Sequence, residues 1–308
     1  MAKIAVDIDR AVAQRIQSGT AGRTDARALA HGAQWSVADV VCTCGPGDRP
    51  FEERHDQFSI ALVAAGSFQY RSTSGAALMT PGALMLGAAG QCFECGHEHA
   101  AGDRCVSFWY GAEYFERIAA DAGWRGPLRF HTPRVPPVRA LSAVAARMLA
   151  GLQQPAETAW EEIGVTLAAS AIACASDRRV VSLPAIPGAE ARVTRAIRAI
   201  DRGDDGDVTL SALAGTARLS PFHFLRTFER LAGLTPHQYV RRARLRTAAS
   251  RLIGGREKVL DVALDSGFGD VSNFNRAFKG EFGVSPKVFR AHDRDQAASN
   301  EHRVASHE

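Results

Sequence analysis

Residues 259–290 have the sequence VLDVALDSGFGDVSNFNRAFKGEFGVSPKVFR, and a related stretch, LSALAGTARLSPFHFLRTFERLAGLTPHQYVR, occupies residues 210–241. The matching pairs include Phe224 with Phe274, Arg226 with Arg276, Phe228 with Phe278, Gly233 with Gly283 and Pro236 with Pro286. Self-similarity at a fixed spacing indicates one supersecondary unit that is used twice. Each copy predicts a short helix, a tight turn and a second helix with an aromatic inner face, which is a helix-turn-helix.

The second helix of each copy has a predictable start and a predictable outer face. Ser220-Pro221 combines a hydroxyl N-cap with proline at the first helical position, and Asp270 or Ser272 begins the corresponding helix of the second copy. Phenylalanines at helical spacing form the inner stripe of each helix. The residues left on the outer faces are Phe222, His223, Leu225 and Arg226, and then Ser272, Asn273, Asn275, Arg276 and Lys279.

Charge and spacing indicate that these outer faces meet DNA. Residues 190–291 carry 18 Lys and Arg against 11 Asp and Glu, a local excess within a chain of net charge +4. In a major groove, arginine reads guanine, Asn and Ser bond base edges, and exposed Phe or Leu meets thymine methyl groups. Residues 236–252 predict one continuous helix that would hold the two units about 34 Å apart, one duplex turn. Lys279 and the arginines of 241–246 either hold phosphates or form an ordinary solvated helix face.

The stretch ALDSGFGDVSNFNRAFKGEFGVSPKVFR closely resembles the second motif of the DNA-binding domain of the AraC/XylS family of bacterial transcription regulators. The resemblance covers residues 190–291, about a third of the chain. It implies double-stranded promoter DNA and RNA polymerase as partners, and activation in preference to repression. The base-facing positions that it implies are Phe222, Leu225, Arg226, Ser272, Asn275 and Arg276.

The first half of the chain has a different pattern of apolar and turn-forming residues. Between 36 and 110, short apolar runs alternate with Gly, Pro, Ser and Asp turns, which predicts an antiparallel sandwich or small barrel. Residues 137–177 have helical spacing on both sides of a Gln-Gln-Pro turn, so they predict a helical hairpin that either covers a sheet or pairs with a second copy. The family resemblance implies a cupin-like barrel that senses a small-molecule effector, followed by a dimerisation hairpin. The expected fold class is therefore α+β, an N-terminal cupin-like antiparallel β-barrel with a helical hairpin and a C-terminal all-α domain with two helix-turn-helix motifs.

The expected domain organisation follows from these changes of texture. Its parts are an N-terminal arm (1–35), a sensor and dimerisation domain (36–177), a linker (178–189), a DNA-binding domain (190–291) and a disordered tail (292–308). No apolar stretch near the start is long enough for a secretion signal, and no run of about 18 apolar residues occurs. We therefore expect a homodimer in the bacterial cytoplasm, at the nucleoid, without a membrane span.

A cluster of cysteines and histidines in QCFECGHEHAAGDRC is the candidate effector or metal site. Its members are Cys92, Cys95, His97, His99 and Cys105, with His55 upstream. Thiol and imidazole ligands at these spacings suit Zn²⁺ or a similar ion, with Cys42-x-Cys44 as an unusual second pair. Thiol-based sensing and an ordinary structural role are the alternatives.

The predicted function is a sequence-specific DNA-binding transcription regulator of the AraC/XylS type, without catalytic residues, controlled by a small-molecule or metal/thiol signal. The alternative is a metal-dependent cupin enzyme fused to a DNA-binding module, which His97-x-His99 suggests because enzymatic cupins use a His-x-His motif. A methyl-accepting damage sensor is a third candidate, which the strand-rich setting of the cysteines disfavours.

Overall fold

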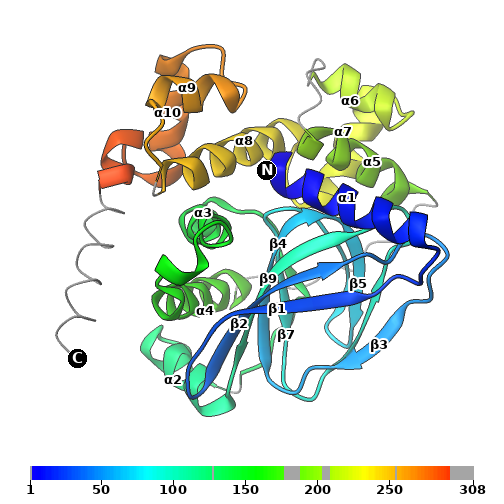
Figure 1. The fold of residues 1–308 in the computed structure, drawn as a ribbon, viewed down its shortest axis with the longest axis vertical. Coiled ribbons are helices and arrows are strands. Elements are labelled where there is room, and N and C mark those ends of the chain that lie inside the picture. Colours follow the sequence, from blue (N-terminus) through cyan, green and yellow to red (C-terminus); the bar gives the residue numbers. More distant parts are fainter. Residues whose placement is uncertain (1, 127, 177–187, 203–208, 254, 292–308) are drawn as a thin grey trace.

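The computed structural model describes residues 2–126, 128–176, 188–202, 209–253 and 255–291. The expected linker, apart from its last two residues, and the expected tail lie outside the described residues. A strand-rich N-terminal half lies against a helical C-terminal half (Figure 1). None of the described helices is long and apolar enough to cross a bilayer.

The N-terminal half contains two antiparallel sheets. The six-stranded sheet has, in order, β1 (Thr24–His31), β2 (Trp35–Cys42), β9 (Asp103–Tyr110), β4 (Phe58–Gly66), β7 (Leu84–Gly87) and β10 (Arg134–Val135). The four-stranded sheet has β3 (Phe51–Arg54), β8 (Cys92–Gly96), β5 (Phe68–Ser72) and β6 (Gly75–Met79). In the described part of the chain no strand pair joins the sheets, so the strands predicted by the turn pattern are present but the expected barrel is not closed.

Strand β4 shows how the sequence builds two layers. Its residues are buried on both faces, except for Gly66 at the end. Ile60 and Leu62 belong to the core under the helices, whereas Ala61 and Val63 pack with Phe68, Tyr70 and other residues of the second sheet. Alternate strand residues point to opposite faces, so a continuous apolar run serves both cores.

The chain passes from β4 to β5 at Gly66, where a side chain would not fit. Its φ is +77°, and a Cβ there would lie 2.3 Å from the carbonyl oxygen of Gly102. Glycine is therefore required for both reasons, the left-handed backbone and the close approach of a neighbouring loop.

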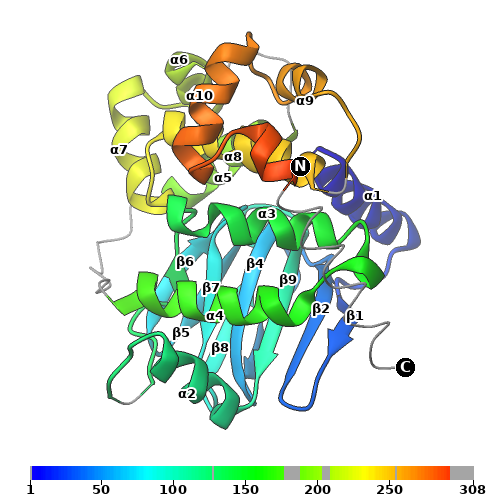
Figure 2. The same ribbon diagram turned by 90° about the vertical axis from the view of Figure 1, so that its left-hand side faces the viewer.

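The predicted helical hairpin covers the outer face of the larger sheet (Figure 2). It consists of α3 (Ser142–Gly151) and α4 (Trp160–Ser176), with single 3₁₀ turns at Arg139–Leu141 and Pro155–Glu157. Helix α2 (Ala112–Asp121) packs beside α4. The apolar residues that give 137–177 its helical spacing are buried in this core: Leu141, Val144, Met148 and Leu152, and Ile163, Leu167, Ala171 and Ala175. Covering a sheet is thus one role of the hairpin.

Residues 1–35 are held more firmly than the sequence suggested. Helix α1 (Ala2–Ser18) buries Ile8 and Val12 in the main core, at 3% and 9% exposure. Strand β1 pairs with β2 along its length, with one irregularity near Ala28. Helix α1 therefore contributes only a narrow stripe to the core.

Six helices with defined bounds lie in the described part of the C-terminal half, and residues 286–291 are helical as well. The six are α5 (Ala189–Arg202), α6 (Leu210–Thr216), α7 (Pro221–Ala232), α8 (Pro236–Leu252), α9 (Val259–Asp265) and α10 (Val271–Phe282). Helices α6 and α7 form the first helix-turn-helix, α9 and α10 form the second, and α8 joins them as the predicted continuous helix. Phe224 and Phe228 fill one core, and Phe274 and Phe278 fill the other, each fully buried.

Candidate nucleic-acid interface and ligand pocket

Helix α7 presents the predicted residues of the first unit on its outer face. Ser220 is its N-cap and accepts a hydrogen bond from the His223 backbone N–H. Phe222 is 67% exposed, His223 and Arg226 are also exposed, and Leu225 is half-buried. The Phe222 ring contacts that of His223 in an edge-on arrangement, and most of its surface is accessible to solvent.

Helix α10 repeats this arrangement. Asp270, one of the two predicted starts, is the N-cap and accepts from the Asn273 backbone N–H at 2.7 Å. The predicted outer residues are all exposed: Ser272, Asn273, Asn275, Arg276 and Lys279. All of the predicted outward residues of the two helices are thus exposed except Leu225, which is half-buried; contact with bases stays a prediction.

Helix α8 spaces the two units, but two of its arginines do not face outward. It has 17 residues, so it is about 25 Å long at the usual rise of an α-helix. Arg242 bonds Glu281 and the Pro137 carbonyl, and Arg246 is buried against the Pro81 carbonyl. Neither alternative offered by the sequence, phosphate contacts or a solvated helix face, holds for these two side chains. Arg242 and Arg246 lie one turn apart on one face of α8, and both donate to carbonyls of the N-terminal half.

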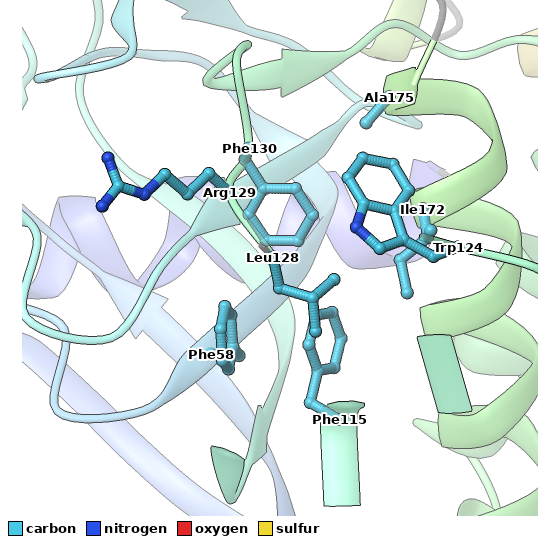
Figure 3. A pocket seen from close by; sticks show the side chains of 8 residues that line it. All are labelled: Phe58, Phe115, Trp124, Leu128, Arg129, Phe130, Ile172 and Ala175. Atoms are coloured by element: carbon cyan, nitrogen blue, oxygen red, sulfur yellow. The ribbon is translucent and has the colours of Figure 1, made fainter. Parts of the chain in front are cut away.

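A pocket of about 510 Å³ lies between the two sheets of the N-terminal half. Its wall includes His55, Cys42, Cys95, Cys105 and His97. This volume is within the range of small-molecule sites. A second hollow, beside α2 and α4, measures only about 10 Å³ and is lined mainly by aromatic and aliphatic side chains (Figure 3), so it has room for about one water.

His55 forms a neutral, ordered part of the pocket wall. Its ring stacks on Phe93 with 4.1 Å between centroids, and its Nε2 lies 2.9 Å from the Tyr70 hydroxyl. Burial lowers the pKa of His55 to about 4, so the ring is uncharged at neutral pH. A neutral imidazole on an apolar wall can donate or accept a hydrogen bond without the cost of burying a charge.

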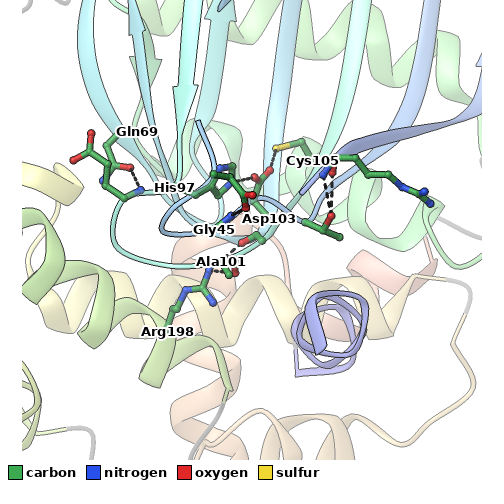
Figure 4. A network of polar contacts seen from close by, with 12 residues as sticks. Gly45, Gln69, His97, Ala101, Asp103, Cys105 and Arg198 are labelled. Carbon is green, nitrogen blue, oxygen red and sulfur yellow. Dashed lines mark hydrogen bonds and ion pairs between the residues drawn. The ribbon is translucent and has the colours of Figure 1, made fainter. Parts of the chain in front are cut away.

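His97 and Asp103 form a buried ion pair at one end of the pocket (Figure 4). The His97 Nε2 lies 2.6 Å from Asp103 Oδ2, and the Cys105 thiol donates to the other carboxylate oxygen at 3.5 Å. Burial opposes the charge on His97, but hydrogen bonds with Asp103 and Cys42 outweigh it and raise its pKa to about 10. Burial raises the pKa of the Cys42 thiol.

The structure divides the predicted cysteine-histidine cluster. Cys92 and Cys95 are three residues apart on β8, so they point to opposite faces: Cys92 is exposed and Cys95 is buried. His99 is half-buried beside Glu98 and does not line the pocket. The side chains of the Cys92-x2-Cys95 and His97-x-His99 motifs therefore do not converge on one ion.

A different group converges instead. Among the described residues that could bind a metal, one ligand atom each from Cys42, Cys44 and His97 lies within 4.8 Å of the others, and all three residues are buried. The sequence identified His97 and, as an unusual pair, Cys42-x-Cys44. It gave no signal for Asp103, whose position beside His97 depends on the pairing of β9 with β2 and β4.

Two helix-turn-helix units joined by one helix, each with an exposed basic second helix, define a tandem helix-turn-helix DNA-binding domain. A family model described as a helix-turn-helix domain matches residues 213–292. The probable transcription factor PqrA of Proteus vulgaris is 35% identical over 83 residues, 27% of this chain and 68% of PqrA. The transcriptional regulator MtrA of Neisseria gonorrhoeae is 33% identical over 93 residues, 30% of this chain and 31% of MtrA. The chain belongs to the AraC/XylS family of transcriptional regulators.

These likenesses concern the C-terminal half. The chain spans about a third of the length of the first curated relatives that it matches, such as MtrA at 31%. Fatty-acid-bound ToxT from Vibrio cholerae aligns over 85% of this chain and 96% of its own, at 13% identity and a TM-score of 0.35. A likeness this distant supports no conclusion about the N-terminal half or its ligand.

Proposed function

We propose that the protein is a sequence-specific DNA-binding transcription regulator, in which an N-terminal ligand sensor controls a C-terminal DNA-binding domain. The exposed face of two matched helices, with Arg226 and Arg276 at equivalent places, is the observation that carries this proposal. Both arginines are exposed, and each stands on a helix fixed by its own aromatic core. Rigid helices that present polar and basic side chains suit entry into a major groove.

The remaining parts of the proposal concern the sensor and the assembly. The pocket between the sheets would bind the effector, in a cupin-like arrangement of the two sheets that stops short of closure. The protein would act in the cytoplasm as a homodimer, through a surface of α3 or α4 that the sheet leaves uncovered, and would activate promoters together with RNA polymerase. The divergence of His97 and His99 leaves the enzyme alternative without its His-x-His motif, so we propose a regulator without catalytic activity.

Genome-wide footprinting of the full-length chain would supply the target sites. At such a site, Arg276→Ala should cost about 1–3 kcal/mol of binding free energy, because a bidentate contact with guanine is lost. On random DNA the same change should have little effect. Lys279→Ala is the matched control on the same exposed helix, and it should weaken binding to both DNAs alike. Equal losses for Arg276→Ala on both DNAs would contradict base reading by this residue, and no preference of the unaltered chain for any site would contradict the proposed function.

A further inference from the structure

The group Cys42, Cys44 and His97 has the composition and size of a metal site. Three atoms no more than 4.8 Å apart share a centre that lies within about 2.8 Å of each, close to the 2.3 Å and 2.0–2.1 Å of Zn–S and Zn–N bonds. Movements of about 0.5 Å at each sulfur and about 0.7 Å at the imidazole nitrogen would therefore close the site. Two thiols and an imidazole select thiophilic ions such as Zn²⁺ or Cu⁺ over Mg²⁺ or Ca²⁺.

A second observation, independent of the ligands themselves, is the carboxylate behind the imidazole. Asp103 bonds His97 through Nε2 at 2.6 Å, so Nδ1 is the ring nitrogen outside that bond. Metal-binding histidines commonly have their other ring nitrogen bonded to a carboxylate in this way, because the bond fixes the ring and makes it a better ligand. Cys42 and His97 also line the 510 Å³ pocket, which provides a path of entry.

The two loops that carry the ligands are already fixed in position. After Cys44, the Asp48 carboxylate accepts from the Gly45 backbone N–H at 2.8 Å and from the Arg15 guanidinium of α1. The Gly102 N–H donates to the Cys44 carbonyl at 2.8 Å, which joins this loop to the segment 97–103. The site is therefore held together before any ion arrives.

The segment 97–103 also touches the DNA-binding half directly. Arg198 on α5 donates to the carbonyls of Ala101 and Gly102, at 2.5 and 2.9 Å (Figure 4). At the other end of the segment, the Glu98 N–H donates to the Gln69 side chain. Gln69 in turn donates to Glu190 at the start of α5. A shift of this segment would therefore change the contacts of α5 at two places, Glu190 near its start and Arg198 further along.

We propose that Cys42, Cys44 and His97 form a binding site for a thiophilic metal ion, and that its occupation is transmitted to α5 through the segment 97–103. The metal site stands without any reference to DNA. The transmission to α5 would be the signal that controls DNA binding, so this part of the inference rests on the proposed function. Ligation releases the thiol protons of Cys42 and Cys44 and one ring proton of His97 to solvent. It draws His97 toward the two thiolates while Asp103 follows, and the carbonyls of Ala101 and Gly102 then move relative to Arg198.

Direct metal binding tests the site. The reduced full-length protein, stripped of metal, is titrated with Zn²⁺ and separately with Cu⁺ against a chromophoric chelator, with Co²⁺ as a spectroscopic probe of thiolate ligation. We expect one ion per chain, loss of this stoichiometric binding in Cys44→Ser and His97→Gln, and an affinity about 10–100-fold lower in Asp103→Asn. Cys92→Ser is the matched control, an exposed cysteine of the sequence motif, and should bind as the unaltered chain does.

Each outcome of this titration supports or overturns the metal site. Absence of stoichiometric binding by either ion, or equal binding by Cys44→Ser and the unaltered chain, overturns the site. Loss of binding in Cys92→Ser would assign the ion to the Cys-x2-Cys motif and also overturns it. Because a buried substitution can disturb folding, each variant is also heated without and with metal. A folded variant shows a melting transition, and a bound ion raises it.

The transmission is tested without DNA first. Backbone hydrogen exchange in α5 should change when metal is added to the unaltered chain, and this change should be absent in Arg198→Gln, which still binds the ion. Unchanged exchange in a metal-loaded chain overturns the transmission and leaves the site standing. Metal-dependent affinity for a footprinted promoter then gives the functional readout, whereas failure to prefer any promoter contradicts the proposed function alone.

Discussion

Glu281 holds the second helix-turn-helix against the N-terminal half, and its replacement tests how the two halves are joined. The carboxylate lies on α10, and its side chain is only 2% exposed. It accepts from the Ser142 hydroxyl on α3 at 2.5 Å and from the Arg242 guanidinium on α8 at 3.1 Å. Three helices therefore meet at one buried charge.

The size of the effect follows from what Glu281→Gln leaves behind. Removing one partner of a fully buried ion pair costs about 3–5 kcal/mol. Arg242 is 17% exposed and keeps its bond to the Pro137 carbonyl, and glutamine can still accept from Ser142, so the loss should be smaller. We expect the free energy of unfolding to fall by about 1–3 kcal/mol.

Urea denaturation of the full-length chain, followed by circular dichroism, measures this change. Arg242→Met and the double variant complete a double-mutant cycle, for which we expect a coupling energy of at least about 1 kcal/mol. Glu116→Gln, an exposed glutamate on α2, is the control and should change stability by less than about 0.5 kcal/mol. A coupling energy near zero would refute the inference that the pair stabilises the junction.

Three further predictions follow from particular contacts. Burial raises the pKa of Asp201 to about 7, so between pH 3.8 and 7 the folded chain holds a proton that the unfolded chain has lost. The contribution of Asp201 to stability is therefore complete below pH 3.8 and is lost as the pH rises to about 7. Asp201→Asn should remove that part of the pH dependence of urea denaturation, and an unchanged slope between pH 4 and 7 would contradict the assignment. Gly66→Ala should lower stability by at least about 1 kcal/mol more than Gly90→Ala, since both glycines have positive φ but only Gly66 has a carbonyl in the way; equal melting temperatures would argue against the clash. Ser220→Ala should cost about 1 kcal/mol through loss of the α7 cap, and calorimetry showing no loss would mean that the cap is dispensable.

The C-terminal half could be predicted closely because its signals are local. Helix caps and phenylalanines at helical spacing act within a few residues, so Ser220 caps α7 and Phe224 is buried, as expected. The inward positions of Arg242 and Arg246 were missed because charge suggests exposure, whereas here the N-terminal half supplies their partners. Docking of one half on another leaves little trace in the sequence of either.

The candidate metal site shows the opposite case. Cys92 and Cys95 are close in the sequence but are separated by the alternation of a strand. Cys42 and His97 are about 50 positions apart, and they meet because β2 pairs Cys42 with Asp103 of β9, which bonds His97. Motif spacing describes ligands correctly only when the local structure is known. In a turn, the Cys-x2-Cys spacing would bring both sulfurs to one zinc ion. In the five-residue strand β8 the same spacing places them on opposite faces.

The DNA-binding half is fastened at both ends of α8, in two different ways. Near its start, Tyr239 bonds the Pro81 carbonyl, and Arg134 reaches from β10 to the Leu231 carbonyl of α7. Near the far unit, Glu281 joins Ser142. Because the continuous helix α8 connects the two attachments, loosening either one would move both helix-turn-helix units together. Both units would then change their contacts with a DNA site at the same time, and not one after the other.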